Sequence, residues 1–174
     1  GVTTLGNNSF GYVLRSGSAL TNNADVTAGD GSIVVFGDGA GNIVNNNSVI
    51  LGGSNGVAFY TVNGGNIQNA GDLTGTAGTA NVGIYNENGI INNTGKIRVG
   101  DSVIRDFEDS SKNSYAIAIY GDKTGITNTG DIELGYYGVG IYSKDNKESG
   151  LPTVNTGKIT SSSEGAIGIF VENG

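Results

Sequence analysis

The sequence contains no Cys, His, Met or Trp and has a single Pro in 174 residues. Without His there is no Ser-His-Asp or Cys-His catalysis and no imidazole ligand for zinc or non-haem iron. Without Cys there is no disulfide, no thiolate nucleophile and no iron–sulfur cluster. Nine basic residues stand against sixteen acidic ones, a net charge of −7, which argues against nucleic acid as a partner. We therefore expect no catalytic residues, no cofactor and no metal site.

Gly and Asn dominate what is present, with 32 Gly and 22 Asn by count. Such a bias favours disorder only when it lacks a period. Here, Asn-containing blocks recur, and the apolar residues that end them are spaced 24, 23, 24, 35 and 27 apart. A second set of blocks ends in an aromatic residue, with spacings of 24, 25, 35, 22 and 28. Two independent markers give one period, which indicates a solenoid, propeller or array.

Each repeat holds three short, β-branched apolar runs separated by Gly, Asn, Asp or Ser. The runs are too short and too Gly-flanked for helices, and no window shows a helical apolar stripe. Three strands in about 24 residues fit one coil of a parallel β-helix, stacked at ~4.8 Å on the next. A propeller blade needs roughly 40–45 residues, and no six-residue period is present. We predict an all-β parallel β-helix (a solenoid) of six to seven coils.

Period-two alternation in the second run assigns the core. The expected inward columns are Ile33, Val57, Val82, Ile117, Val139 and Ile167, together with Val35, Phe59, Ile84, Ile119, Ile141 and Ile169. The expected outward columns are the small residues that begin with Val34 and an aromatic ladder of Phe36, Tyr60, Tyr85, Tyr120, Tyr142 and Phe170. The tyrosines are candidate binding residues for a stacking sugar or partner, or their rings simply stabilise neighbouring coils.

An Asn column is expected to stack at one turn, because an amide both donates and accepts hydrogen bonds. Its members are Asn22, Asn46, Asn69, Asn93, Asn128 and Asn155. Gly two residues later, as at Gly95, suits a turn that needs positive φ. A neighbouring column reads Asp25, Val49, Asp72, Lys96, Asp131 and Lys158, whose alternating signs predict weak ion pairs between coils.

Two insertions interrupt the repeat, near residues 101–113 and 143–152. Loops inserted in a solenoid usually carry its specificity. The first is acidic and offers Arg105, Phe107, Glu108 and Asp109 as candidate binding residues. It is interpreted as a solvated loop or a site for a cation, although it lacks the EF-hand pattern. The stretch 37–43 half matches the calcium-binding nonapeptide but does not recur, so a turn is the simpler interpretation.

No run approaches the ~20 apolar residues of a transmembrane helix, and the N-terminus lacks a secretory signal pattern. Both ends of the chain fall inside the repeat. We therefore expect residues 1–174 to be a single β-helix block of a longer rod.

The turn seen in Asn93-Thr94-Gly95-Lys96-Ile97, the strand Val139-Gly140-Ile141-Tyr142 and the lack of Cys resemble passenger domains of type V autotransporter adhesins. The Asn-rich, acidic character is most similar to large fusobacterial outer-membrane autotransporters. The resemblance covers about residues 20–174. It implies a right-handed β-helix that is secreted through an outer-membrane barrel, stays attached to it and is displayed on the cell surface. It also implies adhesion to a protein or glycan of host or bacterial cells. No binding residue of the family maps onto this sequence.

Three functions are weighed. The first is a non-enzymatic stalk or adhesion segment, favoured by regular coils without a catalytic constellation. The second is a polysaccharide-processing β-helix enzyme, which would need converging carboxylates or a basic residue in a groove. The third is a filament block that associates with itself through its sheet ends.

Overall fold

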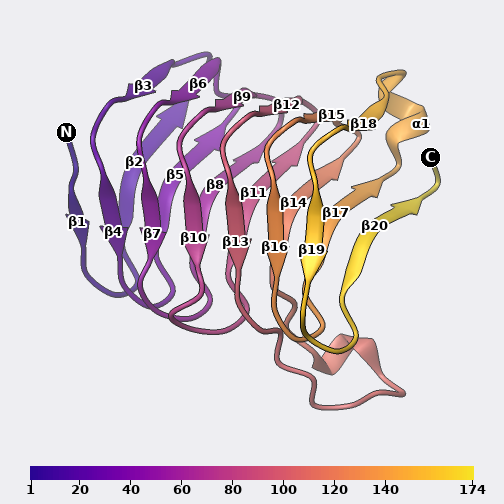
Figure 1. Ribbon diagram of the computed structural model, residues 1–174. Helices are drawn as coiled ribbons and strands as arrows, with labels where there is room; N and C mark the ends of the chain where they lie inside the picture. Colours follow the sequence, from indigo (N-terminus) through magenta and orange to yellow (C-terminus); the bar gives the residue numbers. More distant parts are fainter.

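A computed structural model describes all 174 residues, and it shows a parallel β-solenoid of seven turns built from three sheets (Figure 1). Sheet 1 contains β1 (Thr4–Leu5), β4 (Val26–Ala28), β7 (Val49–Leu51), β10 (Leu73–Gly75), β13 (Ile97–Val99), β16 (Ile132–Leu134) and β19 (Ile159–Ser161). Sheet 2 contains β2 (Phe10–Arg15), β5 (Ile33–Asp38), β8 (Val57–Val62), β11 (Val82–Glu87), β14 (Ile117–Asp122), β17 (Val139–Lys144) and β20 (Ile167–Glu172). Sheet 3 contains β3 (Leu20–Asn22), β6 (Asn42–Asn45), β9 (Asn66–Asn69), β12 (Ile90–Asn93), β15 (Gly125–Asn128) and β18 (Thr153–Asn155).

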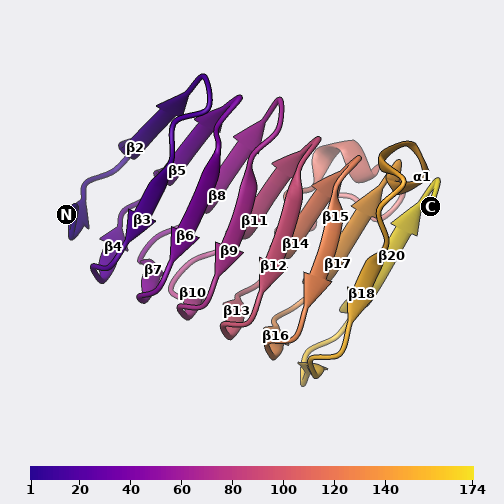
Figure 2. The ribbon, with the colours of Figure 1, turned by 90° about the horizontal axis from the view of Figure 1, so that it is seen from above.

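Each strand pairs in parallel with the equivalent strand of the next coil, as seen from above in Figure 2. Uninterrupted coils repeat after about 24 residues, as between Asn45 and Asn69. The predicted all-β solenoid, with three strands per coil, is confirmed. The only helices are a 3₁₀ turn, η1 (Ser110–Lys112), and one α turn, α1 (Asn146–Ser149). No helix has the length and apolar character to span a bilayer.

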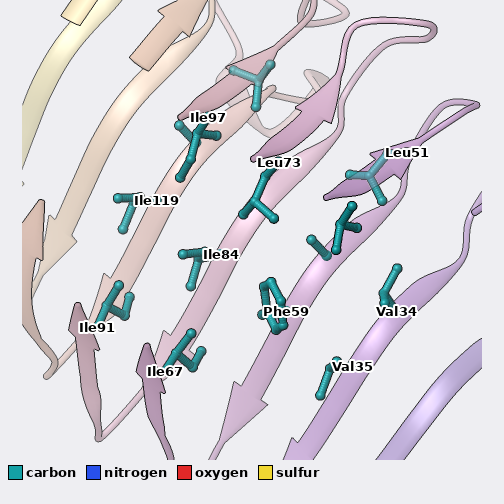
Figure 3. Close-up of a cluster of buried hydrophobic side chains, with 14 of the residues drawn as sticks. Val34, Val35, Leu51, Phe59, Ile67, Leu73, Ile84, Ile91, Ile97 and Ile119 are labelled. Carbon is teal, nitrogen blue, oxygen red and sulfur yellow. The ribbon is translucent and has the colours of Figure 1, made fainter. Parts of the chain in front are cut away.

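The core runs along the rod axis, and one of its predicted columns is wrong. In β5, Val34 and Val35 both lie in the buried apolar cluster (Figure 3). Ile33 is only half-buried and lies outside that cluster. The register skips Val34 between the pairs Ile33–Val57 and Val35–Phe59, so alternation breaks there. The small-residue column therefore faces inward. Its Ala and Gly residues suit a crowded corner, where a Cβ on Gly83 would collide with the carbonyl of Ala118.

The Asn ladder exists, but Asn46 is not part of it. Asn45 pairs in register with Asn22 and is fully buried, whereas Asn46 is exposed. The buried ladder consists of Asn22, Asn45, Asn69, Asn93 and Asn128, and it ends at the half-buried Asn155. Each Nδ2 donates to the Oδ1 of the next Asn at 2.7–2.8 Å. Each Nδ2 also donates to the carbonyl two residues later, as from Asn93 to Gly95 at 2.8 Å. The amides thus satisfy both the turn and the neighbouring coil.

The turn glycines are required by space rather than by backbone conformation. Gly71, Gly95, Gly130 and Gly157 all lack the positive φ that was predicted. A Cβ on Gly95 would instead collide with the carbonyl oxygen of Gly71 in the preceding coil. Stacked turns approach each other so closely that only Gly fits.

The predicted ladder of ion pairs is also wrong. Ser48, rather than Val49, aligns with Asp25, since Val26 pairs with Val49. The carboxylates accept backbone N–H groups of the next coil instead, as Asp131 Oδ1 does from Lys158 N at 3.0 Å. The ammonium of Lys96 pairs with Glu133, which lies outside this column.

The two insertions leave from different corners. The first connects β13 in sheet 1 to β14 in sheet 2 and projects beyond the coils (Figure 1). The second joins β17 in sheet 2 to β18 in sheet 3 and contains α1. It begins at Asp145 rather than Ser143, because Ser143 and Lys144 belong to β17 and Ser143 is fully buried.

Candidate binding surface

The aromatic ladder lies on the outer face of sheet 2, one ring per coil. Tyr60 and Tyr85 stack at a centroid distance of 4.4 Å and 3° between planes, and Tyr85 and Tyr120 stack at 4.6 Å and 7°. Tyr142 is tilted from Tyr120 by 37°, and Phe170 from Tyr142 by 49°. Phe36 and Tyr60, nearer the N-terminus, are 5.9 Å apart. The ladder is therefore closely stacked in its middle, wider towards the N-terminal coils and tilted towards the C-terminal coils.

This geometry limits what the tyrosines can bind. Parallel rings about 4.5 Å apart cover each other's faces, so no sugar ring can stack between them. The middle rings, Tyr60, Tyr85 and Tyr120, present only their edges and hydroxyl groups. Their stacking stabilises neighbouring coils, whereas the tilted ring of Tyr142 is not covered by a parallel neighbour.

Carboxylates hold two of the hydroxyl groups. Tyr85 Oη donates to Glu87 Oε1, and Tyr142 Oη donates to Glu172 Oε2 in the following coil, both at 2.5 Å. Burial and the bond to Glu87 raise the pKa of Tyr85 far above its ordinary value. The bond to Glu172, with burial, raises the pKa of Tyr142 to about 12. Both phenols therefore stay protonated at neutral pH and act as hydrogen-bond donors.

The first insertion is a self-contained loop. Val103 and Ser114 form an antiparallel bridge at its neck, and Asp109 caps η1 by accepting the backbone N–H of Ser111. Lys112 forms ion pairs with Asp106 and Asp109. The hydrogen bond from Lys112 lowers the pKa of Asp106, and the bond from the Ser111 hydroxyl lowers that of Asp109.

The candidate residues of this loop do not converge on one ligand. The Arg105 guanidinium donates to the Lys112 carbonyl, and the Glu108 backbone N–H donates to Asp106. Phe107 is 72% exposed and packs edge-on against Tyr137, with centroids 5.6 Å apart. Asp106 and Asp109 are engaged with Lys112, and no group of three or more acidic side chains is arranged to hold a metal ion.

An apolar groove, which the sequence analysis did not predict, joins this loop to the tilted end of the ladder. Its volume is about 330 Å³. The outward column contributes Ile117, Val139 and Ile167, and the ladder contributes Tyr142 and Phe170. Ser110 and Tyr115 line it from the loop. We call these seven residues the ladder groove.

Only Tyr142 of the predicted site residues lines the ladder groove. Tyr60, Tyr85 and Tyr120 lie along the ladder in earlier coils, and the four loop candidates do not line the groove. A strict period of two predicts Ile117, Val139 and Ile167 inside the core, but the alternation breaks at the corner of the strand. One feature of the sequence could have indicated the groove. The apolar residue Ile117 of this column follows directly after the first insertion, so the inserted loop lies next to the column.

A second, more polar groove of about 520 Å³ lies on sheet 1, with Arg98, Asp101 and Glu133 in its lining. Glu133 pairs with Lys96, and its Oε2 lies 3.1 Å from Arg98 Nε. The hydrogen bond from Lys96, supported by Arg98, lowers the pKa of Glu133. This carboxylate is therefore held ionised, which is unsuited to donating a proton as a general acid.

No family model, no curated protein and no solved structure matches this chain.

Proposed function

We propose that this chain is a β-helical stalk and adhesion segment of a bacterial surface protein of the autotransporter type. In this proposal it is extracellular and attached, in the full-length protein, to an outer-membrane barrel. Its coils act as a scaffold, and the surface of sheet 2 beside the first insertion contacts a protein or glycan of a host or bacterial cell. The proposal involves no catalysis.

One observation carries the proposal: the solenoid departs from regularity where an exposed loop meets an apolar groove. The middle coils satisfy their polar groups internally through the Asn ladder and the backbone pairing. Phe107 is strongly exposed on the loop, and Ser110 and Tyr115 of the same loop line the ladder groove. Exposed aromatic residues and apolar grooves are typical of interaction sites rather than of inert spacers.

Attachment of cells to beads coated with the protein tests this function. We expect beads carrying the whole chain to retain host or bacterial cells above the level of albumin-coated beads. A variant in which residues 104–113 are replaced by Asn-Gly should lose most of this attachment, because it lacks the exposed part of the loop. A matched control replaces the second insertion, residues 146–151, by Gly-Ser-Gly and should attach normally.

The results separate the two roles of the segment. If the loop variant attaches as well as the whole chain, the loop is not the adhesive element. If the whole chain attaches no better than albumin, the adhesive role is rejected and only the spacer role survives. Release of unsaturated or reducing sugars from acidic polysaccharides would instead favour an enzyme.

A further inference from the structure

The ladder groove has the composition of a pocket for an apolar side chain. Val139 belongs to the outward column of sheet 2 and yet is only 6% exposed, whereas Ile117 in the same column is half-buried. The groove is thus deepest at Val139. Its volume of about 330 Å³ lies at the small end of the range for ligand pockets, roughly 300–1,000 Å³.

The groove is poorly suited to a sugar. Its only polar side-chain groups are the Ser110 hydroxyl and two tyrosine hydroxyls, and that of Tyr142 is already bound to Glu172. A sugar needs several convergent polar groups to replace its hydration. An aliphatic or aromatic side chain needs none, and each buried CH₂ contributes about 0.8 kcal/mol.

The groove has an acidic rim on the side where the strands of sheet 2 reach their C-terminal ends. Glu172 sits at this rim, where it accepts the Tyr142 hydroxyl. Glu87 and Asp122 occupy the same position in earlier coils, and Asp145 follows β17. Two bases lie among them: Lys144 is paired with Asp122 and Asp145, and Lys123, which follows β14, is paired with Glu148. With Glu148 counted, five carboxylates therefore accompany two ammonium groups.

The loop side is acidic as well. Asp106, Glu108 and Asp109 outnumber Arg105 and Lys112, and Lys112 is already paired with two of these acids. The groove thus lies between two rims of net negative charge in a chain of net charge −7. Electrostatic complementarity therefore favours a cationic partner at this groove and disfavours an acidic one.

We propose that the ladder groove binds an extended peptide segment of a partner protein, with one apolar side chain between flanking Lys or Arg residues. The apolar side chain fills the space between Val139, Tyr142 and Tyr115. The flanking basic residues meet Glu172 on one rim and the acidic loop on the other. This assignment rests on the proposed adhesive function and specifies its partner as a basic, apolar peptide rather than a glycan.

Titration of the whole chain with capped peptides, followed by amide chemical shifts, tests the assignment. The probe is acetyl-Lys-Leu-Lys-amide, with acetyl-Glu-Leu-Glu-amide and acetyl-Lys-Ser-Lys-amide as references. We expect saturable shifts around Ile117, Val139 and Ile167 with the first peptide. Binding of each reference peptide should be about tenfold weaker, since one lacks the complementary charge and the other the apolar side chain.

Two pairs of matched variants locate the site. Ile117→Thr keeps a β-branched residue but makes the groove wall polar, and it should weaken binding about fivefold. Ile33→Thr changes the same residue in the same column, away from the groove, and should leave binding unchanged. Glu172→Gln should weaken binding two- to threefold, roughly the effect of one exposed charge pair, and reduce its salt dependence. Glu164→Gln serves as its control on the same coil.

Several results would overturn the assignment. These are equal or tighter binding of the acidic peptide, equal effects of Ile33→Thr and Ile117→Thr, or shifts in the groove produced by maltoheptaose instead of the basic peptide. Concentration-dependent dimerisation that Ile117→Thr abolishes would make the occupant a second copy. Cell attachment without peptide binding rejects this assignment alone, whereas peptide binding without attachment rejects the adhesive function alone.

Discussion

At the scale of the residue, the buried Asn side chains link one coil to the next. Asn45 Nδ2 donates to Asn69 Oδ1 at 2.7 Å and to the Asn47 carbonyl at 2.8 Å, while its Oδ1 accepts from Asn22. The sequence predicted such a ladder but assigned Asn46 to it, because the run Asn45-Asn46-Asn47 fits the period in more than one register. When adjacent residues are of the same type, only the packing of the folded chain determines which of them joins the buried ladder.

Truncating Asn45 and Asn46 in turn distinguishes the two registers. Asn45→Ala leaves the buried Asn22 amide and Asn69 Oδ1 without their partners, at about 1–3 kcal/mol for each unsatisfied group. We expect Asn45→Ala to lower the free energy of unfolding by about 3 kcal/mol. Asn46→Ala removes one exposed bond to Asn23 and should cost about 0.5 kcal/mol. Urea denaturation followed by circular dichroism measures both, and equal losses would contradict the register.

The Tyr142–Glu172 bond makes stability depend on alkaline pH. The pKa of Tyr142 is raised to about 12 in the folded chain, against about 10 for an unfolded tyrosine. The folded state therefore holds this proton more tightly. Its contribution to stability is present below about pH 10 and is lost as the pH rises towards 12.

Removing the phenol tests this linkage. We expect Tyr142→Phe to lose less stability than the unmodified chain between pH 10 and pH 12, because it has no proton to release there. Glu172→Gln should also flatten the profile, since it removes the carboxylate that holds the proton. Melting temperatures across this range provide the measurement, and parallel profiles for all three chains would refute the linkage.

At the scale of the element, the strands of sheet 2 depart from simple alternation at one position. Val34 and Val35 both point inward, so the chain turns a corner before the regular pleat begins. A sequence pattern of period two cannot show this, because the residues in the Val34 column are small enough to suit either face. The same error hid the ladder groove, whose floor was assigned to the core.

The first insertion is a loop added between two strands that keep their regular pairing with the neighbouring coils. Val103 N donates to the Ser114 carbonyl at 2.8 Å, and Ser114 N donates back at 3.0 Å, so the neck is closed independently of the tip. Replacing residues 104–113 with Asn-Gly, a favoured hairpin turn, should keep the β-sheet circular dichroism signal. The melting temperature should change by only a few degrees, because the pairing of β13 with β16 and of β11 with β14 does not involve the tip. An unfolded product would show that the loop is part of the core instead.

At the scale of the whole molecule, the period of the sequence was sufficient to predict the topology. Three apolar runs per repeat fix three parallel sheets, because each coil can bury its apolar side chains only by stacking on its neighbours. The candidate site was predicted only in part. The sequence located the aromatic ladder and the loop, but the groove also depends on three-dimensional packing, which places Ser110 and Tyr115 of the loop in one lining with Val139.

A rod whose coils contact only their neighbours should respond to damage locally. Asn128→Ala breaks the ladder between Asn93 and Asn155, in the C-terminal half of the rod. We expect hydrogen exchange in β15–β20 to accelerate at least tenfold, while exchange in β5–β8 stays within about twofold of the unmodified chain. Thr127→Ala, on the exposed face of the same strand, is the matched control and should leave exchange unchanged throughout. Mass spectrometry of peptic fragments measures each region separately. Uniform acceleration from β5 to β20 would show that the seven turns open as one cooperative unit.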